Sequence, residues 1–323
     1  MQSGARANRG SASYPPISPL SSCRGIDGIR KIYRKKDVDG RNTWRQVVRS
    51  QSSGRACADP LVLLSGHDNR GNDIVKAILI ALIVTAFASA ASAQPLPGGF
   101  VFLRDIDPSI IQDIRYAGSN NFVGRPLAGY QAAECVVKRE VGLALKNIQQ
   151  ELARQKLSLK MLDCYRPVRA VHDMVLWSRN GAEPPAQKRF NPAFRKQDLF
   201  RLGYIAGHSA HSTGAALDLT LVDLTADNSL QFDPTKSYAA CTAPASARAP
   251  EGSVDMGTGY DCTDVMAHTA ASSINPVQRR WRNTLVSAMA KQGFVNYSKE
   301  WWHFSLPGAG RPAYDFPITP RMR

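Results

Sequence analysis

The sequence predicts one α+β domain over residues 94–323, with a mainly antiparallel central sheet flanked by helices. Segments with strand and helix patterns follow one another in mixed order, without the regular βαβ alternation of a parallel sheet. Helical segments are marked by apolar spacing and by Pro and Gly at their expected ends. No internal repeat and no low-complexity linker divides this part of the chain, so we expect a single domain.

Short apolar runs predict the strands. Residues 157–164 and 215–222 have the character of core strands, and Gly214 loosens the backbone just before the second run. The remaining strands or extended pieces are expected at residues 100–106, 113–116 and 294–306.

Three segments are expected to be helical. The longest covers residues 134–155, where apolar side chains recur at mostly helical spacing. Pro167 is suited to a helix entrance and precedes a helix expected at 168–177. Gly293 is a typical C-terminal stop for the helix expected at 276–292. Between the strand expected at 215–222 and this last helix, residues 223–254 are expected to form an irregular loop.

Residues 1–73 differ in character from the domain. They are rich in Ser, Gly and Arg and show no sustained period of 2 or 3.6. Such a segment buries too little apolar surface to offset the entropy of ordering it. We therefore expect an upstream extension that is disordered or is not part of the natural translation product.

Residues 74–93 predict a secretory signal peptide. Lys76 precedes an apolar run of 12 residues, and small residues follow up to Ala93, where cleavage is expected. The run is too short to cross a bilayer core of about 30 Å, so no stable membrane anchor is expected after cleavage. Because a signal peptide normally begins a protein, we expect translation to start at Val75, and the protein to be exported, to the periplasm.

About half of the net charge of +15 lies in residues 1–73. Residues 1–73 hold 13 Lys or Arg against 6 Asp, a net charge of +7. The rest of the chain has no long basic block and no interleaving of basic and aromatic residues, which argues against a nucleic-acid partner. The simpler interpretation is that the remaining charged residues form an ordinary solvated surface. The alternative is that they attract anionic cell-wall polymers.

Four cysteines fall within the expected domain. An even number of cysteines in an exported protein predicts two disulfides, here with three pairings open. We favour Cys135 with Cys164 and Cys241 with Cys262, since the second pair closes a loop rich in Pro, Ala and Gly. None has CxxC spacing, so the cysteines are not assigned to a metal.

Two histidines and an aspartate predict a zinc centre. Catalytic zinc usually takes three ligands from His and carboxylate side chains and leaves a fourth position for water. The ligands for one zinc ion per chain can come from His211, Asp218 and His303, if the last strand returns beside the strand that holds Asp218. Glu300 is then the candidate general base.

The spacing of these residues requires the backbone to turn. Residues three or seven apart on a straight strand point to opposite faces of the sheet. We therefore expect a turn at Gly214, between His211 and Asp218, and a bulge or strand end between Glu300 and His303. On a helix, His208 would form an alternative metal pair with His211.

Two motifs carry a resemblance to a known family. Residues 209–218 have the pattern SxHxxGxAxD, and residues 300–303 have the pattern ExxH. The chain resembles the LAS-type zinc peptidases (lysostaphin, D-alanyl-D-alanine metallopeptidases and sonic hedgehog), and within them the VanX-type D-alanyl-D-alanine dipeptidases, from about residue 106 to 316. The resemblance implies a hedgehog/DD-peptidase-like fold, zinc held by His211, Asp218 and His303, and Glu300 as the base.

The resemblance also implies roles around the substrate. Arg166 looks like the arginine that stabilises the tetrahedral oxyanion. Tyr116 and Asp261 are similar in setting to the residues that hold the free amine of the substrate, a contact that an internal peptide could not supply. Ser209 is the candidate for binding the substrate carboxylate.

Together these features predict zinc-dependent hydrolysis of D-alanyl-D-alanine or a similar small peptide, in the turnover of cell-wall peptides. A D,D-carboxypeptidase acting on longer peptidoglycan peptides is one alternative. A non-catalytic, zinc-stabilised binding module is another, although such a module needs neither Glu300 nor Arg166. The loop at 223–254 appears longer than in compact dipeptidases, which leaves open how strictly the pocket selects its substrate.

Overall fold

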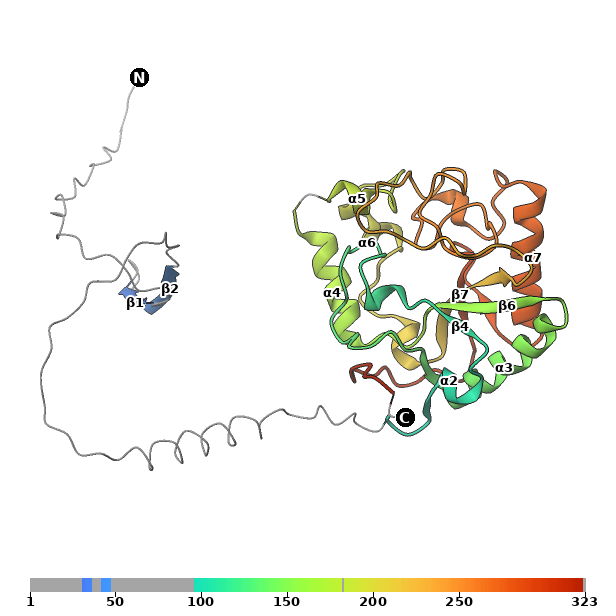
Figure 1. Cartoon of the computed structure of the whole chain (residues 1–323). Coiled ribbons are helices and arrows are strands. Elements are labelled where there is room, and N and C mark those ends of the chain that lie inside the picture. The colour runs from blue at the N-terminus through green and yellow to red at the C-terminus, as the bar shows by residue number, and fades with distance from the viewer. Residues whose placement is uncertain (1–30, 37–41, 48–95, 182, 322–323) are drawn as a thin grey trace, which may run out of the picture. The chain divides into compact units, whose positions relative to one another are not determined.

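The structure is a computed structural model that describes residues 31–36, 42–47, 96–181 and 183–321 (Figure 1). The chain divides into two units, Met1–Ala88 and Ser89–Arg323. In the first unit, β1 (Lys31–Lys36) pairs antiparallel with β2 (Asn42–Val47). The signal peptide expected at 74–93 lies outside the described residues, so it stays a prediction, as does the assignment of residues 1–73 to an upstream extension.

A five-stranded sheet forms the centre of the second unit, in the order β4-β6-β7-β9-β8. Only the β4–β6 pair is parallel, and the other three pairs are antiparallel, which confirms the predicted mainly antiparallel sheet. A separate pair joins β3 and β5. The strand bounds are β3 (Phe100–Phe102), β4 (Ile111–Gln112), β5 (Val136–Lys138), β6 (Leu157–Asp163), β7 (Ala216–Asp223), β8 (Val295–Asn296) and β9 (His303–Ser305).

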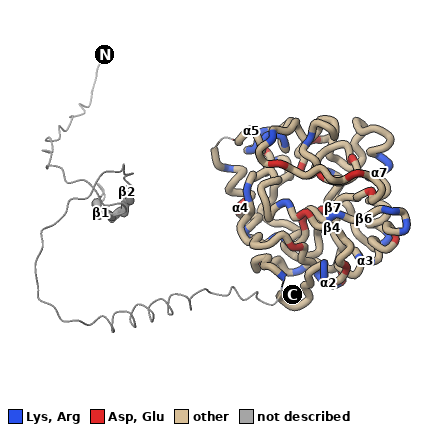
Figure 2. Tube along the Cα trace, in the orientation of Figure 1, with Lys and Arg blue, Asp and Glu red and all other residues tan. Residues whose placement is uncertain are grey.

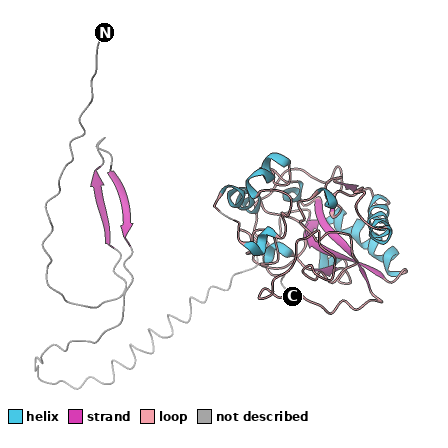
Figure 3. Ribbon diagram, turned by 90° about the horizontal axis from the view of Figure 1, so that it is seen from above, coloured by secondary structure: helices cyan, strands magenta, loops and turns pink. Residues whose placement is uncertain are grey.

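Helices lie on both sides of the strands (Figure 3). The helix α3 contacts β6 and the helix α7 contacts β7, whereas α4 lies at the opposite side of the domain in Figure 1. The α-helix bounds are α2 (Leu103–Ile106), α3 (Arg139–Ala153), α4 (Val168–Arg179), α5 (Pro185–Lys188), α6 (Leu199–Leu202) and α7 (Pro276–Ala290). Short 3₁₀ helices are η1 (Arg115–Ala117), η2 (Lys196–Asp198), η3 (Ala210–Thr213) and η4 (Val265–Ala267). Among the described residues, no helix combines the length and the apolar character needed to span a membrane.

The two longest strands of the sheet are the core of the domain. Every residue of β6 is buried, and all but the last residue of β7 are buried. Apolar residues recur through both strands, with buried polar residues between them, and this recurrence is why the sequence predicts the two strands well. The helix α7 also begins and ends as its sequence indicates. Asn275 and Gln278 form a capping box at its start, and Gly293 adopts a φ of 83° after its end.

Several short elements differ from the sequence prediction. Residues 134–155 are not one helix, because β-branched residues at 136–137 pair with β3 before α3 begins. Residues 100–106 change from strand to helix after Phe102. The piece expected to be extended at 113–116 ends in η1, and the strand expected at 294–306 is a hairpin, β8 and β9, with a turn between. The loop predicted at 223–254 begins one residue later, because Asp223 is the last residue of β7, and residues 224–254 contain no helix or strand.

Both favoured disulfides are present, Cys135–Cys164 and Cys241–Cys262. The first joins the residue before β5 to the residue after β6. The second ties the loop at 224–254 to the segment that holds Asp261. Lys and Arg are spread around the domain and do not gather in one block (Figure 2).

Candidate active site

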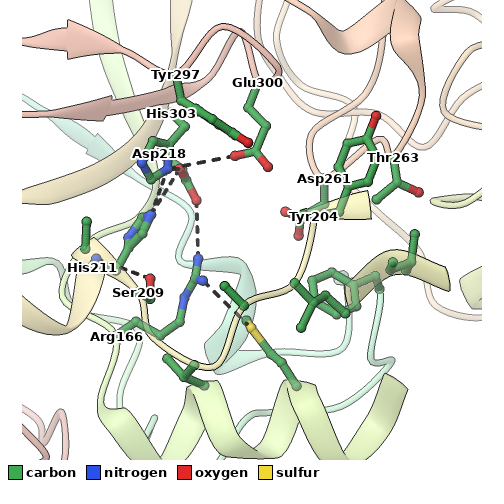
Figure 4. Close-up of a pocket in the computed structure, with 18 of the residues that line it drawn as sticks. Arg166, Tyr204, Ser209, His211, Asp218, Asp261, Thr263, Tyr297, Glu300 and His303 are labelled. Carbon is green, nitrogen blue, oxygen red and sulfur yellow. Dashed lines mark hydrogen bonds and ion pairs between the residues drawn. The ribbon is translucent and has the colours of Figure 1, made fainter. Parts of the chain in front are cut away.

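A cavity of about 360 Å³ opens beside the central sheet (Figure 4). Apolar side chains of α4 and α6 form part of its wall, including Met174 and Leu199. The polar part of its wall contains all eight side chains that the sequence singles out, although they come from distant segments. These are Tyr116, Arg166, Ser209, His211, Asp218, Asp261, Glu300 and His303.

His211 reaches the cavity because the backbone turns before β7. It lies in η3, where the Ser209 hydroxyl accepts a hydrogen bond from the His211 backbone N–H at 3.3 Å. Gly214 ends η3 with a φ of 78°, and a Cβ atom there would lie 2.3 Å from Phe100. The turn predicted at Gly214 is therefore confirmed, and it needs glycine for both its backbone conformation and its close packing.

Asp218 and His303 are brought together by strand pairing. They are directly opposite each other in the antiparallel β7–β9 ladder, so their side chains lie on the same face. Glu300 precedes β9 and lies in the turn that leads into it. The strand end predicted between Glu300 and His303 is therefore confirmed, and it lets both side chains face the cavity.

Three donor atoms meet at one point. Nε2 of His211 lies 3.1 Å from Nδ1 of His303, which in turn lies 3.0 Å from Oδ1 of Asp218. The third side of this triangle, from His211 Nε2 to Asp218 Oδ1, is 3.3 Å. Ligands at about 2.0–2.1 Å from a tetrahedral zinc ion are roughly 3.3 Å apart, so the spacing of these atoms fits such an ion. His208 also lines the cavity but is not part of this group.

Partners behind these side chains hold them in orientation. Nδ1 of His211 lies 2.8 Å from the carbonyl oxygen of Cys164 and 3.3 Å from Oδ2 of Asp163, so the acceptors place its proton on Nδ1 and leave Nε2 free to bind a metal. The Tyr260 hydroxyl donates to Oδ2 of Asp218 at 2.8 Å. Oδ1 of Asp218 is thereby directed toward the two histidines.

Arg166 faces the three donor atoms from the side opposite the β8–β9 hairpin (Figure 4). Its guanidinium group is held by Asp163, with Nε at 2.9 Å and Nη2 at 2.8 Å from Oδ2, and Nη2 also lies 3.5 Å from Oδ2 of Asp218. The guanidinium carbon lies 4.8 Å from the centre of the Tyr116 ring. Burial lowers the pKa of Arg166, but the Asp163 carboxylate, together with Tyr116, Tyr130 and Asp218, more than offsets it and holds that pKa well above its usual value, so the group stays a cation.

Glu300 is a nearly buried carboxyl group beside the donor atoms. Its Oε2 lies 3.9 Å from Nδ1 of His303. Burial raises the pKa of Glu300 to about 7, against the smaller opposite effect of His303. A carboxyl group with that pKa can both accept and return a proton near neutral pH.

Tyr116 and Asp261 form a buried pair at another part of the wall. The Tyr116 hydroxyl lies 2.8 Å and 3.0 Å from the two carboxylate oxygens of Asp261. Burial, and then the charge of Asp218, raise the pKa of Asp261 well above its usual value. Asp261 has a φ of 58°, which is uncommon for a residue with a side chain.

The sequence interpretation missed the supporting residues Asp163, Tyr260 and Tyr130. Asp163 binds Arg166 and approaches His211, and the Tyr130 hydroxyl donates to its Oδ1 at 2.6 Å. An acid at the end of an apolar strand, three residues before a candidate catalytic arginine, is the signal that could have identified Asp163. Tyr260 directly precedes the predicted site residue Asp261, which is the signal that could have identified it. Tyr130 has no such signal, because only the folded chain brings it near the site.

Comparison with known proteins agrees with this geometry. The peptidase family described as D-ala-D-ala dipeptidase matches residues 97–246 and 222–320. The D-alanyl-D-alanine dipeptidase of Streptomyces coelicolor is 32% identical over 226 residues, which cover 69% of this chain and 100% of that protein. The corresponding enzyme of Enterococcus faecium is 31% identical, over 68% of this chain and 98% of that protein. That of Escherichia coli K12 is 30% identical, over 65% of this chain and 85% of that protein.

The matched residues cover the central sheet, the cavity and every predicted site residue. The resemblance drawn from the two motifs is thus confirmed over most of the domain, and the chain belongs to the D-alanyl-D-alanine dipeptidase family of peptidases.

Proposed function

We propose that this protein is a zinc-dependent dipeptidase that hydrolyses D-alanyl-D-alanine. The observation that carries the proposal is the meeting of three donor atoms, from His211, Asp218 and His303, within 3.3 Å of one another in a cavity that also holds Glu300 and Arg166. A structural metal site needs no base and no additional cation, so this combination favours catalysis over a binding role.

His211, Asp218 and His303 would hold the zinc ion. Their donor set, two imidazoles and one carboxylate, is one that catalytic zinc uses, and three protein ligands leave a fourth position open. When bound, zinc supplies Lewis acidity toward a carbonyl oxygen and makes a water molecule more acidic. The hydrogen bonds behind His211 and Asp218 hold the ligands in position before any metal arrives.

Glu300 acts as the general base in this proposal. It takes a proton from the attacking water and later delivers it to the amine of the departing D-alanine. Its pKa of about 7 suits both steps, because a lower pKa would weaken the acid and a higher one would remove the base.

Arg166 stabilises the negative charge that develops on the carbonyl oxygen. The Asp163 carboxylate fixes the guanidinium before the reaction, so little reorganisation is needed when charge appears. Loss of one such fixed donor typically costs about 3–4 kcal/mol in the barrier.

Tyr116 and Asp261 bind the free amine of the substrate and so select a dipeptide over a longer peptide. Asp261 is buried near other acidic side chains, and the ammonium group of the substrate would be a cationic partner for its carboxylate. A longer peptide has an uncharged amide at this position and would leave the carboxylate without a cation. Ser209 lines the same cavity, and its hydroxyl has a proton to donate to the substrate carboxylate.

The expected setting is the periplasm, where the enzyme would recycle dipeptides released from the cell wall. The support for export is the signal-peptide pattern at residues 74–93 and the two disulfides, which suit an oxidising compartment. Fractionation of the native host, with detection of the mature amino terminus near Gln94, tests this part of the proposal.

Two measurements test the reaction. Glu300→Gln should retain bound zinc and lose turnover of D-alanyl-D-alanine, and unchanged turnover would reject Glu300 as the base. Free D-alanyl-D-alanine should be hydrolysed far faster than its amine-blocked form. Equal rates on the two substrates would reject the proposed recognition of the free amine and favour the D,D-carboxypeptidase alternative.

A further inference from the structure

The backbone of Asp261 has a conformation that its own side chain disfavours. Its φ of 58° lies in the left-handed region, which residues with a side chain adopt much less readily than glycine does. Among the described residues, the hydrogen bonds of Asp261 are confined to its carboxylate, which accepts from the Tyr116 hydroxyl. A strained residue persists only where its surroundings fix it. The groups that fix Asp261 therefore control a side chain of the candidate active site.

Cys241 is attached to the chain on both sides of Asp261. Its sulfur forms the disulfide with Cys262, the residue that follows Asp261, and its carbonyl oxygen accepts a hydrogen bond from the Gly259 backbone N–H at 2.8 Å. These two attachments close a small ring, the Cys241 ring, which consists of Cys241 and residues 259–262. Cys262 is fully buried and Cys241 nearly so. The strained residue is thus enclosed between a covalent bond and a hydrogen bond.

The Cys241 ring is itself anchored to the rest of the domain. The backbone N–H groups of Cys241 and Thr263 donate to the carbonyl oxygens of residues 189 and 190, respectively, each at 2.8 Å. Within the ring, the Tyr260 backbone N–H donates to the carboxylate of Glu251 at 2.9 Å. The ring is therefore held as a unit, and its closure at the disulfide sets the direction of the side chain next to it.

The ring presents two side chains to the active site. The Tyr260 hydroxyl contacts Asp218, and the Asp261 carboxylate lines the cavity beside Tyr116 (Figure 4). In the proposed function, Asp261 is the partner of the ammonium group of the substrate. Such a contact tolerates little movement, because a displacement of about 1 Å in a site of this kind can cost about 100-fold in rate.

We propose that the Cys241–Cys262 disulfide determines specificity, by holding Asp261 in the conformation that recognises the free amine of the dipeptide. This inference rests on the proposed function of Asp261. Without the disulfide, the backbone of Asp261 would relax toward an ordinary conformation and its carboxylate would move away from Tyr116. The enzyme would still hydrolyse peptides, but it would lose much of its preference for a free amine.

The preference is measured as the kcat/KM for free D-alanyl-D-alanine divided by the kcat/KM for its amine-blocked form, at saturating zinc. General destabilisation lowers both values together, so it does not change their ratio. Cys241→Ala/Cys262→Ala should lower the ratio about tenfold or more, comparable to the loss of one hydrogen bond to a charged group. A ratio equal to that of the unchanged protein would overturn the inference.

The matched control is Cys135→Ala/Cys164→Ala. It also removes one buried disulfide, but one that lies outside the Cys241 ring. The carbonyl oxygen of Cys164 contacts His211, so this variant can lose activity on both substrates, whereas the ratio should stay unchanged. An equal fall of the ratio in both double variants would refute the assignment to the ring. If Cys241→Ala/Cys262→Ala does not fold, Cys241→Ala/Cys262→Val replaces it, because valine fills more of the volume left by the sulfur.

Asp261→Asn, with both disulfides intact, separates the inference from the proposed function. It removes the charge of the carboxylate, so it should lower the ratio at least as far as the loss of the disulfide does. A fall in Asp261→Asn without a fall in the cysteine variant would overturn the role of the disulfide and leave the proposed function standing. An unchanged ratio in Asp261→Asn would reject Asp261 as the partner of the amine, and the inference would fail with it.

Discussion

Tyr260→Phe is expected to weaken zinc binding without displacing a proposed ligand. The Tyr260 hydroxyl donates to Oδ2 of Asp218 at 2.8 Å, and both side chains are buried. The other neighbour of that oxygen, Nη2 of Arg166, is 3.5 Å away, so it compensates only partly. A hydrogen bond to a charged group contributes about 1.5–3 kcal/mol, and its loss would reduce zinc affinity roughly ten- to hundredfold.

Competition with a chromogenic chelator measures this change directly and does not depend on activity. The matched control is Tyr165→Phe, which also removes a buried tyrosine hydroxyl, but one whose hydrogen bonds are to the backbone of Phe316. A zinc dissociation constant that is unchanged in Tyr260→Phe, or that changes equally in both variants, would refute the reasoning that the Tyr260 hydroxyl orients Asp218.

Three further predictions concern turnover, pH and folding. Arg166→Met should lower kcat about 100- to 1000-fold, with zinc content close to that of the unchanged protein, and a loss below tenfold in steady-state assays would contradict its proposed role. Because burial raises the pKa of Glu300 to about 7, its basic form is lost as pH falls through 7, so kcat/KM should fall about tenfold per pH unit below that value; a profile that is flat down to pH 5 would argue against it. Gly214→Ala places a Cβ atom 2.3 Å from Phe100 at a φ of 78°, so unfolding should become easier by about 2 kcal/mol or more, seen as a Tm lower by at least about 4 °C, whereas an unchanged Tm would mean that the turn adapts without strain.

The parts of the site that the sequence predicts are those whose residues lie in short, patterned segments. His211 and Asp218 share one motif with the glycine that turns the chain between them, and Glu300 and His303 share another. The strand that carries Asp218, β7, is also predictable, because apolar residues recur along its whole length.

The parts that the sequence did not predict depend on contacts between distant segments. Residues 136–137 continue the apolar pattern of α3, but pairing with β3 outweighs that local signal and makes them a strand. Tyr130 lies 33 residues from Asp163, and nothing in its local pattern distinguishes it from a core tyrosine. Such second-layer residues are defined by what they touch, so they become visible only once the chain is folded.

The register between β7 and β9 is what assembles the proposed metal site. Asp218 faces His303 in this ladder, and a shift of one residue would turn His303 to the other face of the sheet. The neighbours of these residues prevent that shift, because Leu217 and Phe304 are fully buried on the opposite face and would have to exchange places with polar side chains. The stability of the core and the convergence of the donor atoms therefore have the same cause, so a substitution that loosens this packing should weaken metal binding even where it touches none of the proposed ligands.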